Sequence, residues 1–148
     1  MGEAVTFTSR VARDHRTALE RLLFFNGCQS RFAHEIAHAI DRYGPPEIRE
    51  QEGWLRVSVG SHDDVQSLFA VELETGRPIG VAVYMRSDVE HVTVLHLGLN
   101  EEYCAGGRRS EARLLLRLMK EIRRSSRRVK GVRRLQVAYG AQRSRALP

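Results

Sequence analysis

The 148-residue sequence predicts an α+β domain. Residues 12–25 and 31–43 carry apolar side chains at helical spacing, whereas several segments within residues 54–99 alternate between apolar and polar side chains. A third helical pattern over residues 110–124 is followed by a strand-like segment at 135–139. Because a strand, a helix and a returning strand favour parallel pairing, we expect a crossover at the end of an otherwise antiparallel sheet.

The N-terminal part of the chain is predicted to form a short strand and then two helices. The strand covers Val5–Thr8, and the first helix covers Ala12–Phe25. Asn26 and Gly27 end this helix, because Asn-Gly is a turn dipeptide. The second helix runs from about Arg31 to Tyr43 and ends at the Gly-Pro-Pro sequence of residues 44–46.

Four alternating segments after residue 50 are predicted strands. They cover residues 54–60, 67–74, 78–85 and 91–99. Turn-forming sequences separate the last three of them, which favours an antiparallel meander. The glycine-containing sequence CAGGRRSEA (104–112) then opens the predicted third helix, which starts at about Ser110. If the strand at 135–139 lies at the edge of the sheet, a second copy of the chain could cover it, so a homo-oligomer is an open alternative.

One domain is expected for a chain of this length. It comprises a helical part (1–50), the sheet and crossover helix (54–139) and a tail (140–148). The sequence has no apolar run long enough to cross a membrane and no signal-peptide pattern, and its two cysteines are isolated. These features predict a cytoplasmic protein without membrane contact.

Charge is distributed unevenly along the chain. Residues 1–107 carry 10 Lys and Arg against 16 Asp and Glu, whereas residues 108–148 carry 14 against 2. Such a basic segment can face the phosphates of a nucleotide cofactor, the phosphates of a nucleic acid, or water.

Residues 75–139 resemble the central part of the GNAT superfamily of acyl-CoA-dependent N-acetyltransferases. The matching features are the turn and strand GRPIGVAVY, a strand that runs into LGLNEEY, the glycine-containing loop, the long helix, and a strand after a basic turn. The resemblance implies a GNAT-like α+β fold and transfer of an acetyl group from acetyl-CoA to an unknown amine. The last helix and strands of the family have no counterpart after residue 139, where only GAQRSRALP follows.

In this family the strand before the loop binds the pantetheine arm through its backbone, and the loop wraps the pyrophosphate of coenzyme A. The resemblance places these roles on Leu97, Gly98 and Leu99 of the strand and on Gly106, Gly107, Arg108, Arg109 and Ser110 of the loop. Glycines let the backbone approach an anion, and the helix that follows adds its positive dipole end. Cys104 and Arg109 replace the first and last residues of the family pattern R/Q-x-x-G-x-G/A.

Two residues are candidates for acid–base catalysis. His96 stands where the family often has an acidic residue, and an imidazole of near-neutral pKa can remove a proton from an ammonium acceptor. The alternative role for His96 is that of a strand histidine that faces solvent or bonds a backbone carbonyl. Tyr139, or alternatively Cys104, is the candidate acid that protonates the departing thiolate.

The sequence HEIAH (34–38) matches the H-E-x-x-H pattern of zinc peptidases. On a helical wheel, however, His34 and His38 fall on the polar side of the predicted second helix, as in an ordinary surface helix. The extended pattern with a third histidine is absent, because position 44 is Gly44. A zinc peptidase is therefore a weaker alternative, with His34 and His38 as its metal ligands.

A second alternative is a GNAT-like binding or assembly protein without catalytic activity. The shortened C-terminal part and the altered loop favour it. Its arginine-rich segment RRSSRRVKGVRR (123–134) could contact nucleic acid, but the segment holds no aromatic residue on which bases could stack.

Overall fold

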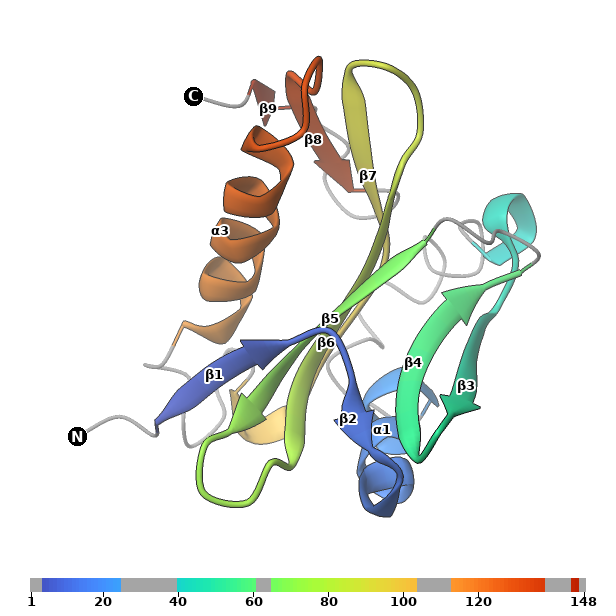
Figure 1. Cartoon of the computed structure of the whole chain (residues 1–148), viewed down its shortest axis with the longest axis vertical. Coiled ribbons are helices and arrows are strands. Elements are labelled where there is room, and N and C mark those ends of the chain that lie inside the picture. The colour runs from blue at the N-terminus through green and yellow to red at the C-terminus, as the bar shows by residue number, and fades with distance from the viewer. Residues whose placement is uncertain (1–3, 25–39, 61–64, 104–112, 138–144, 147–148) are drawn as a thin grey trace.

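The computed structural model describes residues 4–24, 40–60, 65–103, 113–137 and 145–146, which form an α+β fold with two sheets (Figure 1). The six-stranded sheet has the order β1-β5-β6-β7-β8-β9, and the three-stranded sheet has the order β2-β4-β3. The strands of the larger sheet are β1 (Val5–Thr8), β5 (Gln66–Glu72), β6 (Pro78–Arg86), β7 (His91–Leu99), β8 (Arg134–Val137) and β9 (Arg145–Ala146). Those of the smaller sheet are β2 (Val11–Ala12), β3 (Pro46–Gln51) and β4 (Trp54–Val59).

The meander is confirmed for its last three predicted strands, and the crossover is confirmed. Strands β5, β6 and β7 pair antiparallel in succession. The chain then forms helix α3 (Leu114–Arg127) and returns as β8, which pairs parallel with β7 from His91 to Val94. No helix among the described residues is both long and apolar enough to cross a membrane.

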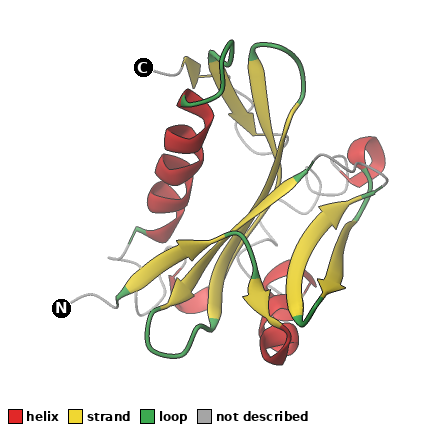
Figure 2. Cartoon of the chain, viewed as in Figure 1, coloured by secondary structure: helices red, strands yellow, loops and turns green. Residues whose placement is uncertain are grey.

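The larger sheet is covered on both faces (Figure 2). Helix α3 packs on one face, where Leu114 and Leu118 meet Ile79, and Ile122 meets Ala82. Helix α1 (Arg16–Phe24) and the smaller sheet lie on the other face, where the apolar side chains of both elements join Val81 and Val83 of β6 in a single buried cluster. Strand β6 is therefore buried from both sides, which explains its almost continuous run of apolar residues.

The smaller sheet corrects two predictions. Strand β4 was expected in the meander but pairs with β2 and β3 instead. No strand was predicted between the Gly-Pro-Pro sequence and residue 54, yet Pro46 begins β3. Proline is tolerated at the first residue of a strand, and Glu52 and Gly53, with φ of 54° and 84°, form the two-residue turn into β4. Most side chains of β3 are exposed, so its sequence lacks the alternation of apolar and polar residues that would predict a strand.

Several element boundaries also differ from the predictions. Residues 11–15 form β2 and a 3₁₀ turn, so α1 begins only at Arg16. Of the predicted second helix, only residues 40–43 lie within the described part of the chain, and they are helical. The predicted tail contributes β9, which pairs antiparallel with β8 over two residues. The returning strand β8 is thus not the edge of the sheet.

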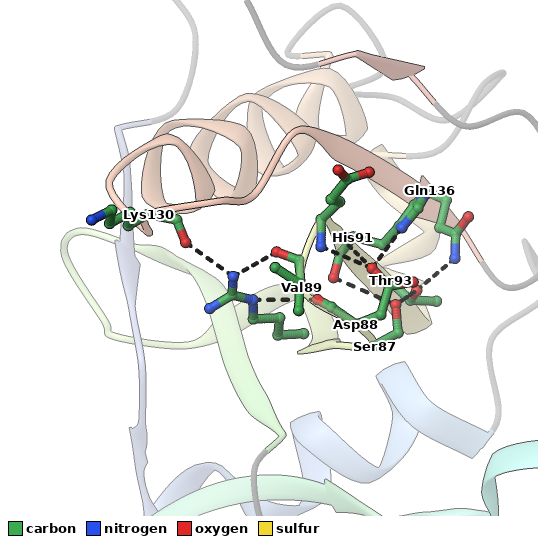
Figure 3. Close-up of polar contacts among 9 residues, drawn as sticks. Ser87, Asp88, Val89, His91, Thr93, Lys130 and Gln136 are labelled. Carbon is green, nitrogen blue, oxygen red and sulfur yellow. Dashed lines mark hydrogen bonds and ion pairs between the residues drawn. The ribbon is translucent and has the colours of Figure 1, made fainter.

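Hydrogen bonds fix β8 and the turn before it to the β6–β7 hairpin (Figure 3). The side-chain amide of Gln136 donates to the hydroxyl oxygen of Thr93 at 2.8 Å, and Ser87 bonds the same hydroxyl at 2.7 Å. Arg86 donates to the backbone carbonyl of Lys130 at 2.9 Å. Strand β8 is therefore held to the sheet by side-chain hydrogen bonds as well as by its backbone pairing with β7.

Two glycines on neighbouring strands let the helices approach the sheet. A Cβ at Gly98 of β7 would overlap the carbonyl oxygen of Leu22 in α1. A Cβ at Gly80 of β6 would come within 3.1 Å of a methyl group of Leu118 in α3. A side chain at position 98 would therefore meet backbone, whereas one at position 80 would meet the end of a flexible side chain.

We expect Gly98→Ala to lower the free energy of unfolding by about 2 kcal/mol, because α1 must shift away from β7. Gly80→Ala is the matched control and should cost less than about 1 kcal/mol, since leucine methyls can move. Urea unfolding followed by circular dichroism measures both. Equal stability of Gly98→Ala and the wild type would contradict the close approach of α1.

Candidate functional site

The C-terminal end of β7 brings together the strand residues predicted for cofactor binding and the beginning of α3. The chain leaves β7 at Leu99, forms a 3₁₀ turn at Glu101–Tyr103, and reaches α3 at Leu114. Ligands of open sheets with helical crossovers commonly bind beyond the carboxyl ends of the strands. We therefore take this end of β7 as the candidate functional site.

A β-bulge re-orients the second half of β7. Val83 of β6 faces His96, whereas the next residue, Tyr84, faces Val94, so Leu95 is an extra residue in the ladder. As a result, both Leu95 and His96 point toward α1. Bulges commonly bend a strand and re-aim side chains in this way.

His96 is buried, with 3% of its surface exposed. Burial lowers its pKa to about 4, although a hydrogen bond with the backbone of Leu23 acts in the opposite direction. The imidazole is therefore neutral at pH 7 and connects β7 to the C-terminal end of α1. This environment agrees with the alternative role given to His96 above, that of a strand histidine bonded to a backbone group.

The three strand residues predicted to line the cofactor alternate between the two faces of the sheet. Leu97 and Leu99 pack among the apolar side chains under α3, and Gly98 faces α1. The side chains of Leu97 and Leu99 thus belong to the core, and Gly98 has no side chain, so a ligand contact from this segment would have to come from the backbone.

The two ends of the glycine-containing loop are anchored in one place. The side chain of Asn100 accepts a hydrogen bond from the backbone N–H of Glu102 at 2.9 Å and so caps the turn after β7. Tyr103, at the end of this turn, is buried in the same cluster as Leu114, the first residue of α3. The segment between them therefore starts and ends beside the C-terminal end of β7.

Asn100 and Tyr103 were not predicted as anchors from the sequence. An Asn directly after a strand is a signal for a side-chain-capped turn, and Tyr103 follows it by three residues.

The start of α3 is a positive helix end. The first turn of α3 holds no acidic residue, and Arg113 precedes it. The positive dipole end of the helix is therefore not neutralised by its own side chains. Nearby, Arg77 bonds Glu72 at 2.8 Å. That hydrogen bond is the main reason why the pKa of Arg77 is raised, and Glu102 adds to it.

Several predicted site residues lie outside the described part of the chain. These are Gly106, Gly107, Arg108, Arg109 and Ser110 of the loop, Cys104, Tyr139, and the pair His34 and His38. Within the described ranges, no group of three or more His, Cys, Asp or Glu side chains could hold a metal ion. The structure therefore leaves the HEIAH alternative a prediction.

The smaller sheet bears two hollows of its own. One, of about 350 Å³, is lined by residues of β3 and β4 that include Arg49 and Arg56. The other, of about 320 Å³, also contains Arg56 and is bordered by Trp54, whose ring lies 4.3 Å from the guanidinium carbon of Arg10. Neither hollow includes a residue of β7 or α3, so they are separate from the candidate site.

Comparison with known proteins adds no family to these observations. Neither a protein-family model nor a curated protein sequence matches the chain. Function is therefore inferred from the geometry at the end of β7 and from the sequence resemblance.

The buried His96 should make the protein sensitive to acid. Because its pKa is about 4 when folded and 6.5 when unfolded, the unfolded chain binds the extra proton first as the pH falls through 6.5. This stabilising contribution is complete above pH 6.5, and by about pH 4 roughly 3 kcal/mol of it is lost. His96→Gln, which cannot titrate, should lose correspondingly less free energy of unfolding between pH 7 and pH 4.

Urea unfolding of both proteins at several pH values measures this difference, and the shared titration of carboxylates cancels in the comparison. Parallel pH profiles for the wild type and His96→Gln would contradict the buried neutral histidine.

Proposed function

We propose that this chain is a GNAT-like N-acyltransferase that moves an acetyl group from acetyl-CoA to an amine. The single observation that carries the proposal is the order of elements at the end of β7. An antiparallel meander leads into a glycine-containing loop anchored at both ends, then into α3, and then into a parallel return strand. This order agrees with the resemblance of residues 75–139 to the family.

The proposed cofactor site uses the backbone and the start of the helix. The resemblance assigns the pantetheine arm to the backbone of Leu97, Gly98 and Leu99, and the leucine side chains of this segment are packed in the core. The loop that contains Gly106 and Gly107 is assigned to the pyrophosphate. The positive dipole end of α3 supports this assignment, because the first turn of the helix holds no acidic side chain and an anion is stabilised there.

The proposed reaction is direct transfer. The neutral amine nitrogen forms a bond to the thioester carbonyl carbon, the carbon–sulfur bond breaks, the nitrogen passes one proton to water, and the departing thiolate of coenzyme A accepts one from the proposed acid Tyr139. Holding the amine and the thioester together supplies most of the rate enhancement in this scheme.

His96 and Tyr139 have unequal support as acid–base groups. With a pKa of about 4, His96 is a weak proton acceptor, and its bond with the backbone of Leu23 suits a residue that positions β7. We therefore assign His96 a positioning role in the reaction, which differs from the base predicted from the sequence. Tyr139, which lies outside the described residues, remains the predicted acid as a substitute for the tyrosine of the family's missing last helix.

Calorimetric titration with acetyl-CoA tests the cofactor assignment. The wild type should bind one equivalent saturably, and Gly107→Glu should weaken binding by at least about tenfold, because a carboxylate would stand beside the pyrophosphate. Ser125→Glu adds the same charge near the other end of α3, at an exposed position, and serves as the control. Its affinity should stay within about threefold of the wild type.

Absence of binding at millimolar acetyl-CoA would overturn the acyltransferase proposal and leave a GNAT-like protein without cofactor. Equal weakening by both variants would show that only overall charge matters and would overturn the assignment of the loop.

A further inference from the structure

Helix α3 exposes a row of cations on the side that faces away from the sheet. Its buried side chains are Leu114, Leu118, Ile122 and Ser126. At ~100° per residue, Lys120, Arg124 and Arg127 lie within about 60° of one another and opposite this buried stripe. All three are exposed. We call them the cationic face of α3.

Few acidic groups balance this face. Residues 113–134 contain ten Lys and Arg and a single acidic residue, Glu121. Glu121 pairs with Arg124 at 3.4 Å, and both side chains are partly exposed, so this ion pair is weak. In the described part of the chain, no ion pair is formed by Lys120 or Arg127. The clustered cations repel one another, and a polyanion laid across them would relieve that repulsion.

The turn after α3 extends the cationic face. Arg128 and Lys130 are exposed, and the backbone carbonyl of Lys130 is held by Arg86. Figure 3 shows the amine of Lys130 pointing away from Val89 and its neighbours. The position of the turn is therefore fixed by its backbone, and its side chains remain available to a ligand.

We propose that the cationic face of α3 and the turn after it bind the phosphate backbone of duplex nucleic acid without regard to sequence. From Lys120 to Arg127 the helix extends over ~10 Å, which matches about three phosphates along one strand when the helix lies along the duplex axis. Described residues 113–137 include no aromatic side chain on which unpaired bases could stack, so a duplex fits better than a single strand. The inference stands independently of acyl transfer, because it uses the outer side of α3 rather than the end of β7.

Fluorescence anisotropy with labelled DNA and RNA duplexes of about 20 base pairs, titrated over a range of salt concentrations, tests this surface. The triple variant Lys120→Glu, Arg124→Glu, Arg127→Glu should bind at least about tenfold more weakly than the wild type. If each cation contacts one phosphate, the slope of log affinity against log salt should fall by about 2.7.

The matched control is the triple variant Arg13→Glu, Arg21→Glu, Arg56→Glu, which makes the same change in net charge at exposed positions of α1, the turn before it and the smaller sheet. It should lose less than about threefold in affinity. The milder variant Lys120→Gln, Arg124→Gln, Arg127→Gln removes the charges without reversing them. Circular dichroism confirms that each variant is folded.

Binding to both duplexes supports recognition of the phosphate backbone. Binding to only one of them also supports the proposal and identifies DNA or RNA as the ligand. The proposal is overturned if neither duplex binds at about 50 mM salt, if the control variant loses as much affinity as the face variant, or if a single strand binds more tightly than the duplex. Binding to vesicles of phosphatidylserine without binding to duplexes would also overturn it, and would indicate a membrane surface as the partner of α3.

Discussion

Burial of β6 and β7 from both sides is the constraint on which the rest of the structure depends. These two strands touch α3 on one face and α1 on the other, and each has a glycine where a helix comes closest. At Gly98 the obstacle to any larger residue is the backbone of α1 itself. The position of α1 is therefore set by the strand, and the smaller sheet packs around the same buried cluster.

The bulge at Leu95 connects this packing to the candidate site. Without the extra residue, His96 would point to the α3 side of the sheet, because consecutive side chains alternate along a strand. With it, His96 reaches the end of α1 and loses its proton to burial. The part of β7 beyond the bulge therefore packs against the core on both faces of the sheet. The residues on either side of the glycine-containing loop, Tyr103 and Leu114, lie together near the C-terminal end of this strand.

The sequence predicts those elements whose pattern is local. Strand β7 was found with its observed bounds because apolar and polar residues alternate from His91 to Leu99. Strand β3 was missed because its Glu and Arg side chains face water, so its pairing with β4 leaves little apolar pattern. The orientation of His96 was not predictable, since it depends on how β6 and β7 pair and on where α1 packs. The burial of Tyr103 was not predictable either, because it depends on contact with the cluster that contains Leu114, a residue distant in the sequence.

The exposed Trp54 has a practical consequence for spectroscopy. It is the only tryptophan in the sequence and is 40% exposed on the smaller sheet, beneath the guanidinium of Arg10. Its emission therefore reports the surroundings of β4 and the segment before β2, and not the end of β7 or the outer side of α3. Intrinsic fluorescence can follow the detachment of the smaller sheet during unfolding. A ligand at either proposed site would leave that signal largely unchanged, so an extrinsic label or heat release is the appropriate readout for binding.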